Sequence, residues 1–537
     1  MERKLGDDNN PITTAGLEVH FSTVLGIVAV GAALLFNSLF WFAYSDRKAS
    51  LFFSLTISSI FIIILILWFC NWNKKSNVSL LLAVSLLISG LAYGAVFTPF
   101  SAPDEDFHFS ASYVLSNFLL GQGYQSEDPV PMRAEDAGFF NDFDIYLNSF
   151  GYEKMVAGFE SPSVSHTEAV DVITNRGHSI TGNPPQCKIA SALGITLGRL
   201  LGFNSYLTYY IGRLFNLILY IVVVVFAFRI TPVGKAVFAV ISLLPMSLHL
   251  AVSYSYDAFV IPMSLLLTAL CLKAILGTGP MRKGEWLSIG LVGALLAPCK
   301  VIYSLIVIIS LFIPKKRFNS RAEEVGIKVA CILICFTPIL ITRLGSVMAT
   351  AGVGASPQPA LSARGGNAND LGTYYTISDV LQRPSKFILM VARTFDQFGF
   401  QYLQRTVGGS LGWFQQEITA PDLMVVFFTV LLVFSLIASK DDDRVLGTRC
   451  RLAGCLLFIM GVLSVMAALL FSWTFTTDNV IYGVQGRYFI PFLPWLLLGL
   501  RPKCIQINAN SIPVLIGTVS FLNILNLVRI FSIALVL

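Results

Sequence analysis

The segment YLTYYIGRLFNLILYIVVVVFAF (residues 206–228) decides the class of fold. It is apolar along almost its whole length, and as a helix it is long enough to cross about 30 Å of hydrocarbon. Similar runs recur along the 537 residues of the chain, whose mean hydropathy of +0.71 lies outside the range of soluble globular proteins. Membrane barrels are built from strands of about ten residues with alternating polarity, so these long runs predict helices. The sequence therefore predicts an all-α polytopic membrane protein.

About thirteen apolar runs are predicted to span the membrane. They lie near residues 20–44, 51–71, 79–97, 206–228, 236–252, 256–276, 285–298, 300–313, 325–343, 422–439, 451–473, 487–500 and 511–532. Residues 188–204 form a further short run, but counting it as a span would invert the orientation of every later loop. We therefore expect it to be an interfacial helix on the outer surface.

Basic loops predict the orientation of this helical bundle. Segments such as WNKKSN (72–77), PKKRFNSR (314–321) and RPK (501–503) are expected in the cytoplasm, which places the two long hydrophilic segments outside. The expected parts are an N-terminal three-helix membrane segment (1–97), a first extracytoplasmic loop with interfacial helices (98–205), central membrane helices (206–343), a second extracytoplasmic loop (344–421) and C-terminal membrane helices (422–537).

The charge and cysteine content exclude some classes of protein. The net charge of +6 is modest and spread over short loops, so nucleic acid is not expected as a partner. The nine cysteines are scattered, mostly inside apolar runs, and they predict neither a metal-ligand set nor a disulfide framework.

An acidic cluster follows the third predicted span, in the stretch FTPFSAPDEDFHFSASY (97–113). Carboxylates that are partly desolvated beside a membrane suit a general base or a metal ligand. The alternative is structural, because Asp104 could cap the helix that follows and the acids would favour its positive N-terminal end. Asp104 and His108 would share a face of that helix.

Three further charges are predicted at the outer ends of helices. Asp257 lies in SYSYDAF (253–259), Lys300 lies with Pro298 in a break between two short apolar halves, and Arg487 lies in YGVQGRYFIPFLP (482–494). Alone, Asp257 could be a helix cap and Arg487 an interfacial anchor. Together with the acidic cluster they suit a base that acts on a polar acceptor while cations hold a phosphate.

Several short motifs occur in a characteristic order. They are P-D-E-x-x-H (103–108), N-P-P (183–185), R-L-F-N (213–216), L-L-P-M-S-L with S-Y-D-A-F (243–259) and G-V-Q-G-R-Y-F-I-P (483–491). From about residue 95 to 500 the chain resembles a bacterial multispanning family long catalogued as a domain of unknown function, which is similar to the GT-C glycosyltransferases. Gln186 and Cys187 depart from the residues that usually follow N-P-P in that family.

The resemblance implies a GT-C-like fold in the bacterial cytoplasmic membrane, with its active site facing outside. It implies an inverting transfer of a sugar from a polyprenyl phosphate to a cell-surface glycan or a lipid-linked oligosaccharide, with membrane lipids as neighbours. Asp104 would be the base, with Glu105 as rival or metal ligand, and Lys300 and Arg487 would bind the lipid phosphate. The residues expected to line the site or contact the acceptor are His108, Tyr254, Asp257 and Gln485. Whether a divalent cation takes part stays open.

A transporter or flippase for a lipid-linked or anionic substrate is the alternative function. It would call for charges at mid-bilayer depth and for broken helices in matching halves of the chain. The charges here are predicted mostly at the outer surface, and the long loops are asymmetric, which favours the transferase.

Overall fold

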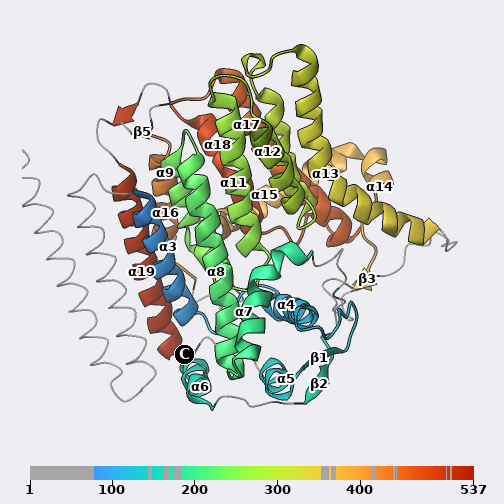
Figure 1. Cartoon of the computed structure of the whole chain (residues 1–537), viewed down its shortest axis with the longest axis vertical. Helices are drawn as coiled ribbons and strands as arrows, with labels where there is room; N and C mark the ends of the chain where they lie inside the picture. Colours follow the sequence, from blue (N-terminus) through green and yellow to red (C-terminus); the bar gives the residue numbers. More distant parts are fainter. Residues whose placement is uncertain are drawn as a thin grey trace, which may run out of the picture.

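The computed structural model describes residues 78–142, 148–162, 168–174, 178, 184–351, 362–363, 371–412, 419–439, 442, 444–502, 505–507 and 511–536. The predicted spans near 20–44 and 51–71 lie outside these residues. The described chain is mostly helical, as the sequence predicts (Figure 1).

Six of the described helices are long and apolar enough to cross a membrane. They are α3 (Val78–Val96), α8 (Ser205–Ile230), α11 (Asp257–Leu276), α13 (Arg321–Ala351), α17 (Thr448–Ser472) and α19 (Ile512–Val536). In Figure 1, α19 (red), α3 (blue) and α8 (green) lie side by side, and α11 packs against α8. Their shared apolar surface forms the main core, with residues such as Leu217, Leu267 and Leu527 fully buried.

Several other predicted spans are shorter or interrupted, so the count of thirteen is not confirmed. The elements in question are α9 (Lys235–Ser242), α10 (Pro245–Ala251), α12 (Lys283–Leu296), the 3₁₀ helices η2 (Val301–Phe312) and η6 (Gly486–Phe492), α16 (Asp422–Phe434) and α18 (Leu493–Leu500). Prolines explain two of the interruptions, because Pro245 and Pro491 have no backbone N–H to donate. Breaks of this kind leave backbone groups and side chains free to build a polar site within the bundle.

The first predicted extracytoplasmic loop is folded against one end of the bundle. Its elements are α4 (Glu105–Leu119), β1 (Val130–Arg133), α5 (Ala134–Asn141), α6 (Ser149–Glu160), β2 (Ala169–Val172), η1 (Pro185–Cys187) and α7 (Ile189–Leu200). Strands β1 and β2 are antiparallel, with Val130 opposite Val172. Aromatic residues such as Phe109 and Tyr209 join these elements to α8 in a second core, so the first loop forms a structured cap over the bundle end.

Helix α7 corresponds to the run at 188–204. It packs against α8 and α4 on one side, while Leu193, Leu197 and Leu200 are exposed on the other. An apolar face that no described element covers suits a helix lying on the membrane surface, and this placement stays a prediction.

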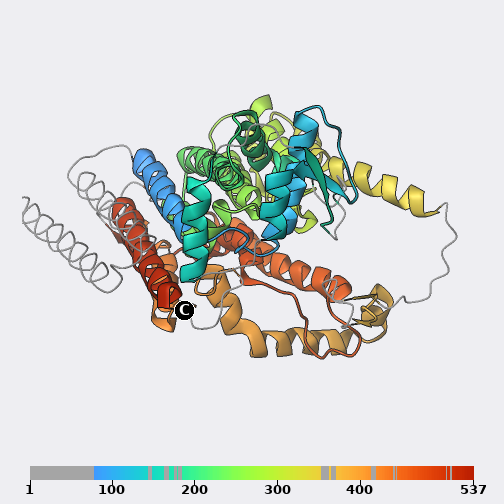
Figure 2. The same ribbon diagram turned by 90° about the horizontal axis from the view of Figure 1, so that it is seen from below.

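Two short helices, two further strand pairs and one long helix are the other described elements. The helices are η3 (Lys315–Arg317) and α14 (Ile377–Gln382); the pairs besides β1–β2 are β3 (Ser362–Ala363) with β4 (Leu371–Gly372), and β5 (Ala438–Ser439) with β6 (Gln506–Ile507). The remaining long helix, α15 (Pro384–Val407), packs against η6. Seen from below (Figure 2), α15 (orange) lies on the side opposite the blue and cyan elements of the first loop.

Gly486 allows the close contact between η6 and α15. A Cβ atom placed there would collide with the carbonyl oxygen of Tyr402 and lie 2.7 Å from the backbone nitrogen of Thr406. Both neighbours are backbone atoms of a helix, so neither can turn aside.

We expect Gly486→Ala to lower the free energy of unfolding by about 1–3 kcal/mol, the usual cost of overpacking. Thermal unfolding of the detergent-solubilised protein measures the change. Gly399→Ala is the matched control, since Gly399 lies on α15 with nothing near its Cβ position, and it should be neutral or slightly stabilising. Equal melting temperatures for the two variants would contradict this packing.

Candidate functional site

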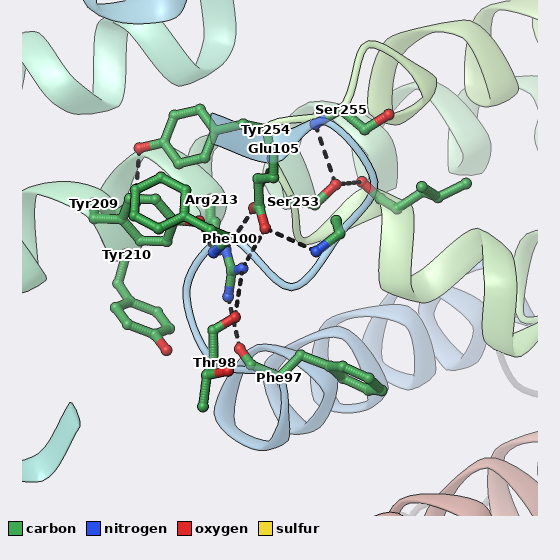
Figure 3. A network of polar contacts seen from close by, with 12 residues as sticks. Phe97, Thr98, Phe100, Glu105, Tyr209, Tyr210, Arg213, Ser253, Tyr254 and Ser255 are labelled. Carbon is green, nitrogen blue, oxygen red and sulfur yellow. Dashed lines mark hydrogen bonds and ion pairs between the residues drawn. The ribbon is translucent and has the colours of Figure 1, made fainter. Parts of the chain in front are cut away.

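Glu105 and Arg213 form a buried ion pair that links the start of α4 to α8 (Figure 3). Arg213 Nε and Nη2 donate to Glu105 Oε1 and Oε2 over 2.9 and 2.7 Å, a bidentate arrangement. The relative exposures of the two residues are 0% and 1%. Charge-assisted bidentate pairs are among the strongest polar contacts in proteins, so this pair fixes where α4 begins.

Backbone groups satisfy the remaining polar atoms of the pair. The amides of Ala102 and Tyr254 each donate to the Glu105 carboxylate over 3.1 Å. Arg213 donates to the carbonyl oxygens of residues 97 and 98 over 2.8 and 3.1 Å. A carboxylate that accepts four hydrogen bonds and has no exposed surface offers little to a substrate or a metal ion. The position of Glu105 therefore favours a structural role over that of base or metal ligand.

Asp104 differs from its neighbour in both backbone and exposure. It is partly exposed, and its φ of +55° and ψ of 26° lie in the left-handed region, which few residues other than glycine adopt. Its side chain makes no capping hydrogen bond to α4, so the interpretation of Asp104 as a side-chain cap is wrong. A residue in the left-handed region persists where the surrounding structure holds it in place, and such residues are frequent at functional sites. Here the Glu105–Arg213 pair, one residue away, supplies that constraint.

Asp257 and Arg487 form a second buried ion pair. Arg487 Nη1 lies 3.6 Å from Asp257 Oδ2, and the side chains are 4% and 2% exposed. The contact joins the first turn of α11 to η6. The distance is long for a charge-assisted hydrogen bond, and Arg487 Nε has no hydrogen-bond partner among the residues that the structure describes. Arg487 therefore keeps donor capacity within a buried environment.

Lys300 lies next to this pair, among tyrosine rings. Its ammonium donates to the Tyr256 hydroxyl over 2.8 Å and lies 3.4 Å from the centre of the Tyr488 ring. The charges of Asp257, Arg487 and Asp104 all act on it. Among the described residues, Tyr256 accepts from one of its three N–H groups, which leaves donors for a ligand.

Lys188 brings a third cation to Asp257, from the turn that precedes α7. Its side chain is 2% exposed, and its ammonium donates to the carbonyl oxygen of Tyr254 over 3.0 Å. Burial lowers the pKa of Lys188 to about 8, and the carboxylates of Asp257 and Glu105 oppose that shift. We call Lys188, Lys300 and Arg487 the cation cluster.

The charges in this region do not cancel. Glu105 is neutralised by Arg213, so among the residues that the structure describes the cation cluster faces mainly the carboxylates of Asp257 and Asp104. Three cations against two carboxylates leave a positive surplus at a largely buried position. Such a surplus suits an anionic ligand.

The other predicted site residues lie at different distances from the cluster. His108 is buried, with its ring 5.1 Å from that of Tyr256, which binds Lys300. Gln485 is partly exposed and immediately precedes η6. Tyr254 is fully buried, and its hydroxyl donates to the carbonyl oxygen of Tyr209 over 2.8 Å, which favours a structural role over acceptor contact.

No three His, Cys, Asp or Glu side chains come together as a metal-ligand set in the described part of the chain. Glu105, the ligand suggested by the motif, is already occupied by Arg213 and two amides.

Comparison with known proteins places the chain in a family. Residues 86–496 match the family described as "Predicted membrane protein (DUF2142)". The chain belongs to this family. The match confirms the predicted resemblance to a multispanning family of unknown function, and it includes every residue of the site described above. No curated protein and no solved structure matches the chain significantly.

The sequence did not single out Lys188, Tyr256 and Tyr488 as site residues. Each lies inside or next to one of the short motifs described in the sequence analysis, so membership of a motif was the available signal. A motif does not tell which way each side chain points. Tyr254 and Tyr256 are two residues apart, yet the hydroxyl of Tyr254 bonds to α8 and that of Tyr256 bonds to Lys300. Arg213 was visible in R-L-F-N, but its partner Glu105 lies 108 positions away.

Proposed function

We propose that this protein is a membrane glycosyltransferase that moves a sugar from a polyprenyl-phosphate donor to an acceptor hydroxyl. The observation that carries the proposal is the positive surplus of the cation cluster beside the partly exposed, conformationally constrained carboxylate of Asp104. The transfer needs cations that stabilise the leaving phosphate and, next to them, a base that takes the proton of the hydroxyl.

The proposed reaction has the following steps. Asp104 accepts the proton of the acceptor hydroxyl, whose oxygen attacks C1 of the donor sugar. The bond between C1 and the phosphate oxygen breaks, and polyprenyl phosphate leaves with the electron pair. Lys300 and Arg487 stabilise the growing charge on that phosphate, and attack opposite the leaving group inverts the configuration at C1.

A lipid-linked donor suits the surroundings of the site. The cation cluster joins the ends of apolar elements, α11, η2 and η6, so a polyprenyl chain would stay in the hydrocarbon while its phosphate reached the cations. We place the protein in the bacterial cytoplasmic membrane with this site on the outer face, where a cell-surface glycan or a lipid-linked oligosaccharide is the acceptor.

The test is transfer of radiolabelled sugar from polyprenyl-phosphate donors to extracted surface glycan by the full-length protein in proteoliposomes. We expect labelled glycan that depends on both donor and protein. If no donor yields product while the protein moves lipid-linked sugar across the vesicle membrane, the transporter alternative replaces this proposal.

We expect Lys300→Gln to lower kcat/KM for the donor by about 10- to 100-fold, since a charge-assisted hydrogen bond is worth about 1.5–3 kcal/mol. Lys300 is chosen because it is only partly buried, whereas removing Arg487 would leave Asp257 buried without its partner. Lys273→Gln, at an exposed lysine near the end of α11, is the control and should leave transfer unchanged. Equal activity of the two variants would exclude Lys300 from donor binding.

A further inference from the structure

Two cysteines meet beside the cation cluster. Cys187 ends η1, Cys299 follows α12, and both are free thiols in the structure. The Cys187 thiol donates to the carbonyl oxygen of Pro184 over 3.0 Å, and the two thiols lie close enough to act on each other. They are separated by more than a hundred positions, so only the fold brings them together.

Further contacts hold the turn at 184–188 against the end of α12. Gln186 Nε2 donates to the carbonyl oxygen of Leu295 over 3.3 Å, and the Cys299 thiol points at the same oxygen over 3.5 Å. The Lys188 ammonium acts electrostatically on both thiols. The turn at 184–188 is thus docked on the end of α12 through Gln186, while Lys188 donates to the carbonyl oxygen of Tyr254.

We propose that Cys187 and Cys299 form a reversible disulfide that ties the first loop to the break between α12 and η2. The predicted orientation puts both thiols on the extracytoplasmic side, where disulfides persist. Gln186 and the Cys299 thiol share the carbonyl oxygen of Leu295, so a small movement of the turn at 184–188 would bring the two sulfurs to the S–S bond length of about 2 Å. The bridge forms independently of the reaction proposed above.

The chemistry is thiol–disulfide exchange with an external disulfide. Cys299 is the partly exposed thiol and reacts first: its thiolate attacks one sulfur of the external disulfide, and the other sulfur leaves as a thiolate that takes up the proton lost by Cys299. Cys187 then attacks the Cys299 sulfur and releases the second thiol, so two protein thiols are oxidised and one external disulfide is reduced. In the mixed disulfide Cys299 has no S–H left to donate, and the charge of Lys188 still favours the Cys187 thiolate that makes the second attack.

The oxidation state of the two cysteines would affect the geometry of the cation cluster. Lys188 follows Cys187 and Lys300 follows Cys299, so the disulfide would fix the spacing of two cations that lie on separate segments. Neither ion pair of the site is broken by the bridge, because neither thiol belongs to one.

The test is disulfide mapping of the reduced, full-length protein in detergent after equilibration with mixtures of oxidised and reduced glutathione. Free thiols are trapped with N-ethylmaleimide, and the peptides are identified by mass spectrometry. We expect one cross-linked pair containing Cys187 and Cys299, with labelling of both reduced about tenfold or more at the oxidised end and restored by dithiothreitol. Wild-type protein suffices, so the outcome does not depend on the folding of a variant.

Cys299→Ser should abolish the cross-link, whereas Cys455→Ser, which removes another partly exposed thiol, should leave it intact. The proposal is overturned if both thiols stay labelled at every glutathione ratio, if oxidation joins other cysteines, or if glutathione remains on Cys299 without a bridge. None of these readouts measures sugar transfer, so failure here and failure of the proposed function are distinguishable.

Discussion

Replacing Asp104 by asparagine is expected to lower kcat for sugar transfer by about 10²–10⁴-fold, the usual contribution of a general base. Asparagine has nearly the shape of aspartate, but it cannot take the proton of the acceptor hydroxyl. It also tolerates the left-handed conformation found at residue 104, so the backbone should not rearrange. The loss should therefore appear in kcat, with the melting temperature close to that of the wild type.

Asp106→Asn is the matched control for this experiment. It makes the same chemical change two residues away, at an exposed position on α4. The control should retain transfer, and its comparison with Asp104→Asn separates loss of a base from loss of local charge. A folded Asp104→Asn variant with full activity would remove Asp104 as the base.

Part of the site was predictable from the sequence because topology limits which residues can meet. Asp257, Lys300 and Arg487 each lie at the same predicted end of a helix, and a bundle brings such ends together. The structure has Asp257 and Arg487 in an ion pair with Lys300 beside them. The orientation predicted from the basic loops thus put Asp257 and Arg487 at the same end of the bundle, although they lie more than two hundred residues apart in the sequence.

The different roles of two adjacent acids were not predictable. Asp104 and Glu105 are both acids and lie side by side in the same motif, and the left-handed backbone of Asp104 itself separates their roles in the structure. That turn sends Glu105 inward to Arg213 and leaves Asp104 partly exposed. A distant partner decides the outcome, and hydrophobic periodicity contains no information about it.

The number of predicted spans that are broken into shorter helices was also underestimated from the sequence. Apolar composition predicts that a segment prefers hydrocarbon, but it does not report where helical hydrogen bonding stops. The run at 236–252 is one span by hydropathy, yet it divides into α9 and α10 beside Pro245. The prolines were visible, and reading them as breaks within spans would have predicted the segmented bundle more closely.

Glu105→Gln is expected to lower the free energy of unfolding by about 3–5 kcal/mol, because breaking a buried ion pair leaves an uncompensated charge. Glutamine keeps the shape of the side chain, but Arg213 remains charged and nearly inaccessible. The same change should release the start of α4 and with it the conformation of Asp104. Thermal and denaturant unfolding in detergent measure the loss.

The double variant Glu105→Gln/Arg213→Met tests the physical cause. Removing both charges of a buried pair is often close to neutral, so the double variant should regain much of the stability lost in the single one. It should not regain activity if the pair also positions Asp104. A single Glu105→Gln variant that is as stable as the wild type but inactive would point the other way. It would mean that Glu105 releases Arg213 during the reaction and that Glu105, not Asp104, accepts the proton.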